Sequence, residues 1–201
     1  MKTSKQKYLN QEEYAALLKV IREQQDYMLF FLLGNLGLRV GEAVRLRKQD
    51  IDQRKCYVRI PTLKCGMHKG EKHGCLPRGR LPKVYHDMPV ATLVMQMLLQ
   101  YIKQFKIKTW LFPDQDKCHV PTWKAQRKFK RYARQAGLDK VYSVHALRHY
   151  KGVTAYQQLK DIRAVQLLLR HKNINSTVTY TTMDLEGKRQ LIDVLPIVNG
   201  R

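Results

Sequence analysis

The spacing of apolar residues predicts a mainly helical protein. The first amphipathic stripe follows i, i+3, i+4, i+7 spacing and consists of Tyr14, Leu17, Leu18 and Ile21. Asn10 precedes this stripe, and Glu13 follows Asn10 by three residues, which is the pattern of a capping box. We therefore expect a helix to begin directly after Asn10.

The same patterning predicts further elements along the chain. Helices are expected at residues 26–35, 40–47, 91–105, 121–136, 145–159, 161–170 and 185–195. Two short strands are expected at residues 56–61 and 84–89, with a long Gly- and Lys-rich connection at 64–83. Pro121 suits the first turn of its helix, and Gly137 suits the end of that helix. The predicted fold class is mainly α with a small antiparallel β-sheet, an α+β fold.

The composition indicates what kind of partner this protein binds. The 201 residues contain 38 Lys and Arg but 16 Asp and Glu, a formal charge of +22, while 44% are hydrophobic. That apolar fraction is typical of a globular protein, and the excess positive charge indicates a polyanionic partner, for which nucleic acid fits best. The helix at 121–136 is expected to face DNA, although a merely solvated face is the alternative. Its expected DNA-binding residues are Lys124, Arg127, Lys128, Arg131 and Arg134.

Membrane and export classes are not expected. The sequence has no apolar run of about 18 residues, and no hydrophobic signal core follows the basic residues 1–10. The sequence therefore predicts a cytoplasmic, DNA-associated protein with no membrane partner.

Chemically interesting side chains occur in four segments. His145 and Arg148 are three residues apart and share a helix face, and Arg39 follows a predicted helix end. His171 and Tyr180 are nine residues apart, so a single straight helix would place them on opposite faces. A shared site requires a break between them. Turn-forming and capping residues are available there, namely Asn173, Asn175 and Ser176.

Such a set of residues suits phosphoryl transfer. Arginines bind phosphate oxygens bidentately, and histidines donate hydrogen bonds to the same oxygens. Nearby positive charge activates a tyrosine as a nucleophile, and a lysine can protonate a departing oxygen. These groups need neither a metal nor a cofactor.

The order and spacing of these residues resemble the tyrosine recombinase, or phage integrase, family. Arg39 with Glu42 matches the first family box, and His145-x-x-Arg148 matches the second. His171 follows Arg148 by 23 residues and precedes Tyr180 by nine, and both spacings match the family. Residues 110–113, Trp-Leu-Phe-Pro, resemble the segment that precedes the basic helix. One departure is Arg170, which stands where the family usually has glycine.

The resemblance implies the fold of a tyrosine recombinase catalytic domain and a site-specific DNA recombinase. Tyr180 would attack the scissile phosphate to give a 3′-phosphotyrosyl link, and a new 5′-hydroxyl would then reverse the step, giving inversion, integration or excision. Arg39, His145, Arg148 and His171 would hold the phosphate. Lys64 is the best match to the family lysine, with Lys69 and Lys72 in reserve.

The resemblance also implies an organisation and partners. We expect one catalytic domain over residues 1–201, with a family-like core at about 9–184, a C-terminal helix or tail at 185–201, and no N-terminal core-binding domain, similar to short fimbrial-switch-type recombinases. The expected partners are double-stranded DNA, three further copies in a homotetramer on DNA, and accessory DNA-bending proteins. Two alternatives stay open: a catalytically silent DNA-binding regulator, or a relaxing topoisomerase of type IB chemistry.

One cluster has no counterpart in the family pattern. Cys65, His68, His73 and Cys75 lie close together in the long connection, at spacings that zinc ligands can have. The alternative is a basic loop with incidental ligand types. No metal is assigned to the predicted site.

Overall fold

The computed structural model describes residues 8–61, 85–114, 118–138, 142–171 and 173–178. The chain divides into two compact units, residues 1–151 and 152–201, and α6 (His145–Leu159) begins in the first and ends in the second. Among the described residues, no helix combines the length and the apolar character that a bilayer crossing requires.

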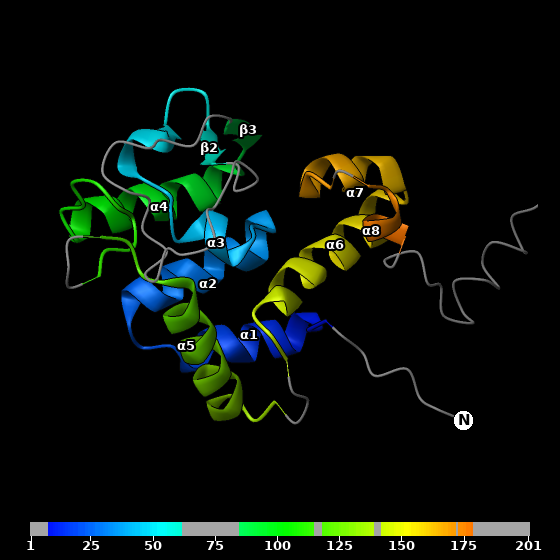
Figure 1. Ribbon diagram of the computed structural model, residues 1–201, viewed down its shortest axis with the longest axis horizontal. Helices are drawn as coiled ribbons and strands as arrows, with labels where there is room; N and C mark the ends of the chain where they lie inside the picture. Colours follow the sequence, from blue (N-terminus) through cyan, green and yellow to red (C-terminus); the bar gives the residue numbers. More distant parts are fainter. Residues whose placement is uncertain (1–7, 62–84, 115–117, 139–141, 172, 179–201) are drawn as a thin grey trace, which may run out of the picture. The chain divides into compact units, whose positions relative to one another are not determined.

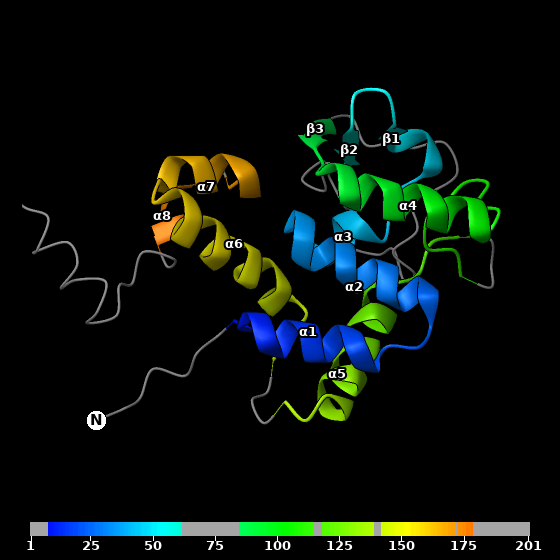
Figure 2. The same cartoon turned by 180° about the vertical axis from the view of Figure 1, so that it is seen from behind.

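The first unit is built around one apolar helix. Its helices are α1 (Gln11–Val20), α2 (Gln24–Leu36), α3 (Val40–Ala43), α4 (Thr92–Gln104) and α5 (Thr122–Gln135), followed by the start of α6. Figures 1 and 2 show α2 between α4 on one side and the crossed pair α1 and α5 on the other, and α2 packs against all three. Most of its side chains are therefore buried, which explains why this stretch is apolar on every face.

The first helix begins as its sequence predicts. The Glu13 backbone N–H donates to Asn10 Oδ1 at 2.7 Å, and the Asn10 backbone N–H donates to Glu13 Oε2 at 2.8 Å. These two bonds satisfy donors that a helix start otherwise leaves unpaired. The ring of Tyr14 then packs so closely on Gly34 of α2 that a Cβ there would lie 2.4 Å from it. Only glycine at position 34 permits this approach of α1 to α2.

A three-stranded antiparallel sheet lies beside the helices. It consists of β1 (Ile51–Asp52), β2 (Tyr57–Pro61) and β3 (Tyr85–Pro89), in the order β1-β2-β3. Val58 pairs with Met88 in the register of β2 and β3, and both side chains are buried. A short 3₁₀ helix, η1 (Lys48–Asp50), leads into β1.

The segment at residues 110–113 forms part of the core of the first unit. Leu111 and Phe112 are fully buried, and the Leu111 carbonyl accepts a hydrogen bond from the Tyr101 hydroxyl at 2.8 Å. The guanidinium of Arg47 lies over the ring of Trp110, 4.3 Å from its centroid. This segment, which follows α4, therefore packs against residues 46–47, which follow α3.

The second unit is a small helical cluster. It contains the last turns of α6, then α7 (Ile162–Leu169) and α8 (Asn175–Val178). The Asp161 carboxylate caps α7 by accepting from the backbone N–H groups of Arg163 and Ala164. Its buried core consists of Ala155, Val165 and Leu169, with Val153, Tyr156 and Leu168 packed around them.

The predicted fold class is confirmed, and the helix break between His171 and residue 180 is confirmed as far as Val178. Several details differ from the expectation, and α2 begins two residues earlier than expected, at Gln24. The helix expected at 40–47 ends at Ala43, because tight bonds from Arg45 N to Glu42 O and from Leu46 N to Ala43 O turn the chain. The two-residue strand β1 was not predicted, since it is too short to show alternation. The connection at 64–83 and the helix expected at 185–195 lie outside the described residues.

Candidate active site

Arg39 lies at the start of α3, three residues after Leu36, the last residue of α2. Its Nη1 donates to Glu42 Oε1 at 2.7 Å, and its backbone N–H donates to Glu42 Oε2 at 2.9 Å. The Glu42 side chain is 5% exposed and that of Arg39 is 36% exposed. Because the carboxylate is buried and grips Arg39 twice, it fixes the guanidinium while part of that group stays open to a ligand.

Arg148 is held by the same stretch of backbone. It lies in the first turn of α6, it is only 6% exposed, and its Nη1 donates to the Gly37 carbonyl at 2.6 Å. Gly37 closes α2 in the left-handed conformation with φ of +60°, which glycine adopts without strain. The carbonyl that positions Arg148 therefore lies two residues before Arg39 in the chain.

His145 lies one turn before Arg148 on α6, and the charges of both Arg148 and Arg39 act on its imidazole. Partial burial lowers the pKa of His145 below its usual value, and the positive charges of Arg148 and Arg39 lower it further. Since both guanidinium charges act on one imidazole, the three side chains share one electropositive environment. At neutral pH this environment favours the uncharged ring, which can donate one hydrogen bond and accept another.

His171 belongs to the second unit, just after α7. Its Nδ1 lies 2.9 Å from Thr177 Oγ1 of α8, and its carbonyl accepts from Gln166 Nε2 at 3.1 Å. Thr177 is fully buried, so it gives the ring a fixed partner and leaves Nε2 as the other functional nitrogen. Arg170, directly before it, ends α7 with φ of +55°.

The structure brings three of the predicted catalytic residues together and describes a fourth separately. Arg39, His145 and Arg148 share the first unit, and His171 is in the second. Tyr180 and Lys64 lie outside the described residues, as do the reserve lysines and the cluster of Cys65, His68, His73 and Cys75. Within the described ranges, no group of three or more His, Cys, Asp or Glu side chains is arranged to hold a metal ion.

The basic helix α5 has two unlike faces. Its buried face consists of Ala125, Phe129, Tyr132 and Ala133. On the opposite side a shallow surface hollow of about 550 Å³ is lined by Trp123, Gln126, Arg127, Lys130, Arg131, Arg134 and Gln135. Trp123 is 53% exposed, so its ring is open to stacking against a partner. We call this exposed side, defined by Trp123, Arg127, Lys130 and Arg134, the outer face of α5.

Two of the five predicted DNA-binding residues are ion-paired within the protein. Lys124 Nζ lies 2.6 Å from Asp114 Oδ2, and Lys128 Nζ lies 2.7 Å from Asp26 Oδ1. Their charges are therefore partly neutralised by carboxylates. Arg127 and Arg134, in contrast, make no ion pair with any of the described acidic residues.

Asp26 anchors α5 to α2. It is 2% exposed and accepts from Lys128 Nζ and from the Tyr132 hydroxyl, the latter at 2.8 Å. Burial raises the pKa of Tyr132 to about 12, and its hydrogen bond to Asp26 contributes. The Arg131 guanidinium stacks on the Tyr132 ring, 4.8 Å from the centroid, and donates to its hydroxyl. Sequence reasoning missed this anchor. The feature that could have indicated it is Asp26 itself, a single acidic residue in an otherwise apolar helix.

Comparison with known proteins identifies the family. Residues 7–186 match the phage integrase family, and the chain belongs to it. A protein named tyrosine recombinase from Pseudothermotoga lettingae is 30% identical over 162 residues, which cover 80% of this chain and 50% of the relative. The chain spans about half the length of this relative and of two further curated relatives, both named tyrosine recombinase XerC.

Solved structures share the fold. The crystal structure of XerA recombinase matches 96% of this chain and 65% of its own, with a TM-score of 0.74 and 21% identity. XerH site-specific recombinase, bound to a palindromic difH substrate in a post-cleavage complex, matches 93% of this chain and 52% of its own, with a TM-score of 0.70 and 20% identity. The resemblance seen in the sequence and the predicted catalytic-domain fold are thereby confirmed.

Proposed function

We propose that this chain carries the catalytic machinery of a site-specific DNA recombinase. The observation that carries the proposal is the anchoring of Arg39 by Glu42 of α3 and of Arg148 by the Gly37 carbonyl, beside His145, in a chain of the phage integrase family. Two fixed guanidinium groups supply the bidentate donors and the positive charge that a phosphodiester needs during strand cleavage. Relatives named as recombinases, and the XerH complex with its difH substrate, support the same reaction.

The reaction has two balanced steps. The Tyr180 hydroxyl gives its proton to solvent as its oxygen attacks the scissile phosphorus, the bond between phosphorus and the 5′ oxygen breaks, and Lys64 donates a proton to that leaving oxygen. Arg39, Arg148 and His171 bind the non-bridging oxygens, and His145 stays neutral and hydrogen-bonds to them. A 5′-hydroxyl from another strand then attacks the phosphotyrosyl link and frees Tyr180. The phosphodiester energy is conserved, so the exchange needs no ATP.

Cleavage is tested with a covalent-trapping assay. The DNA probe is a nicked duplex that contains the sequence this protein selects from a random pool. Wild-type protein should form an adduct that survives denaturing electrophoresis, and Tyr180→Phe should form none while its Kd stays within about twofold. Tyr27→Phe is the matched control, because it removes a phenol hydroxyl from a ring that stacks on Phe31 within α2.

The outcome also decides between this proposal and its alternatives. An adduct that persists in Tyr180→Phe overturns the assignment of the nucleophile. A wild-type protein that binds the selected DNA specifically but never forms an adduct is a regulator. One that relaxes supercoils without joining two sites is a topoisomerase.

DNA binding is assigned to the outer face of α5, with Arg127, Lys130 and Arg134 contacting phosphates. Each phosphate contact on duplex DNA contributes about 0.9 to the slope of log binding constant against log salt concentration. Arg127→Gln should therefore lower that slope by about one, whereas Lys124→Gln, which removes a cation already paired with Asp114, should leave it nearly unchanged. Equal slopes for both variants would contradict the assignment.

The assembly and location belong to the same proposal. Exchange of strands between two duplexes uses four protomers, so we expect a tetramer on paired sites, detectable by sedimentation with DNA, and help from DNA-bending proteins. A recombinase works where its DNA is, which is why the cytoplasmic location expected from the sequence remains part of the proposal. The single-domain organisation over 1–201 stays a prediction.

A further inference from the structure

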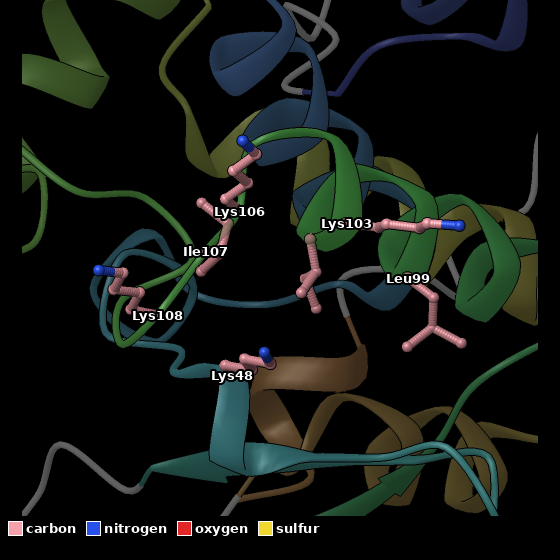
Figure 3. Close-up of a pocket in the computed structure, with 7 residues that line it drawn as sticks. Lys48, Leu99, Lys103, Lys106, Ile107 and Lys108 are labelled. Atoms are coloured by element: carbon pink, nitrogen blue, oxygen red, sulfur yellow. The ribbon is translucent and has the colours of Figure 1, made fainter.

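A second positively charged surface lies at the C-terminal end of α4. An open hollow of about 600 Å³ is lined there by four lysines, Lys48, Lys103, Lys106 and Lys108, and by Leu99, Ile102 and Ile107 (Figure 3). The lining comes from α4, from the chain that follows it and from η1. None of these residues belongs to α5 or to the candidate active site.

The lysines of this hollow differ from those of α5. All four are exposed, and none forms an ion pair with a described acidic residue. No acidic side chain lines the hollow. The charge is therefore available to a partner, unlike that of Lys124 and Lys128, which internal carboxylates neutralise.

Helix capping accounts for only part of this charge. The C-terminal end of a helix carries a partial charge of about −0.5, which one nearby cation satisfies. Four lysines exceed that need. One of them, Lys106, also has φ of +50°, a conformation that costs a non-glycine residue on the order of 1 kcal/mol. Local stability of α4 therefore does not explain the lysine cluster.

The shape of the hollow favours an extended partner with apolar side chains. Figure 3 shows the lysine side chains spread around the hollow, with Lys103 and Lys108 directed to opposite sides. Such a spread suits several separated negative charges better than a single phosphate group. The floor is aliphatic, with Leu99 partly exposed and Ile102 and Ile107 each 7% exposed. An apolar peptide side chain covers the exposed part of Leu99 with more apolar surface than the deoxyribose of a DNA backbone does.

We propose that this hollow docks an acidic segment of a partner protein, with carboxylates on the four lysines and an apolar side chain over Leu99 and Ile107. Complementary charge speeds association and sets the orientation, and burial of the apolar side chain adds affinity. The inference does not depend on recombinase activity, because its readout is peptide binding.

The test uses a labelled synthetic peptide of alternating glutamate and leucine, followed by fluorescence anisotropy at physiological salt. Lys103→Glu/Lys106→Glu should weaken binding by about tenfold or more. Arg127→Glu/Lys130→Glu on α5 changes the net charge by the same amount and should change the affinity by less than about twofold. Lys106→Gly, which suits the local backbone, should fold at least as well as wild type and bind the peptide more weakly.

Three outcomes would overturn the proposal. Equal losses from the two charge-reversal pairs would show that the peptide responds to net charge alone. Equal affinity for a peptide of glutamate and serine would show that the aliphatic floor is unused. Duplex DNA binding that depends more on Lys103 and Lys106 than on Arg127 and Lys130 would make the hollow a nucleic-acid surface. Melting temperatures within a few degrees of wild type show that the variants are folded.

Discussion

Two helix ends in this protein adopt the same backbone shape with different residues. α2 ends at Gly37 with φ of +60°, two residues before Arg39, and α7 ends at Arg170 with φ of +55°, one residue before His171. Glycine takes this conformation freely, whereas arginine is strained in it. Each end thus places a predicted catalytic side chain, but the end of α7 does so at a cost in stability and adds a cation beside the histidine.

The difference separates two ways of placing a predicted catalytic side chain at a helix end. At the end of α2, an unstrained backbone carbonyl holds Arg148, and the guanidinium groups come from Arg39 and Arg148. At the end of α7, the strained residue is itself an arginine, whose Nη1 donates to the Leu168 carbonyl at 3.3 Å. Substitutions at the two ends should therefore have opposite effects on stability.

The largest effect is expected from Gly37→Ala. A Cβ at φ of +60° should destabilise the fold by about 1–2 kcal/mol, and displacement of the carbonyl that holds Arg148 should lower DNA cleavage by about 100-fold or more. Gly137→Ala is the control, since that residue has φ of +67° and open space around it at the end of α5. Urea unfolding should show similar losses for both variants. A similar loss of cleavage in the control would contradict the role of the Gly37 carbonyl.

Thr177→Val tests the support of His171. The change keeps the buried volume but removes the 2.9 Å hydrogen bond to Nδ1, so we expect a loss of stability of about 1 kcal/mol. A freer imidazole should also reduce the cleavage rate by several-fold. Thr177→Ser keeps the hydroxyl and should restore most of that rate. If Thr177→Ser is folded but its cleavage rate stays as low as that of Thr177→Val, the hydrogen bond to His171 does not determine the rate.

Arg170→Gly should act in the opposite direction to Gly37→Ala. Relief of the left-handed strain should raise the unfolding free energy by about 0.5–1 kcal/mol. Lys160→Gly provides the matched control, because Lys160 closes α6 with φ of +53° in the same unit. Both should stabilise the protein, and only Arg170→Gly should alter DNA cleavage. Destabilisation by Arg170→Gly would mean that its side-chain contacts outweigh the strain.

The smallest effect concerns pH and His145. The folded-state pKa of His145 is lowered, so between that value and the ordinary value near 6.5 the unfolded chain binds more protons. Stability from this group is therefore complete above pH about 6.5 and is lost as the pH falls through the lowered pKa. Urea unfolding at pH 7.5 and at lower pH measures this loss. The free energy of unfolding should fall less on acidification in His145→Gln than in wild type. An identical loss would contradict the lowered pKa of His145.

The sequence predicted features that depend on local pattern. The capping box at Asn10, the bounds of α4, α5, α6 and α7 to within one residue, and the break after His171 all follow from periodicity and capping chemistry. The order of Arg39, His145, Arg148 and His171 predicted the site, of which three members share a unit.

Other features depend on contacts between distant segments and could not be derived this way. The bond from Arg148 to the Gly37 carbonyl joins residues 111 positions apart. The pairing of Lys128 with Asp26 spans 102 positions, and periodicity along α5 showed only six cations without dividing them into paired and unpaired groups. The Gly-to-Arg departure at residue 170 was visible in the sequence, but its meaning depends on a backbone angle that only the structure gives.

The placement of the two tryptophans has an optical consequence. Trp110 is covered by Arg47 and lies edge-on to His119, whereas Trp123 is half exposed on the outer face of α5. Acrylamide should therefore quench the emission of Trp123 much more readily than that of Trp110. Shielding of this one indole by a bound duplex would give a label-free signal of when the basic helix is occupied, in the unmodified protein and in real time.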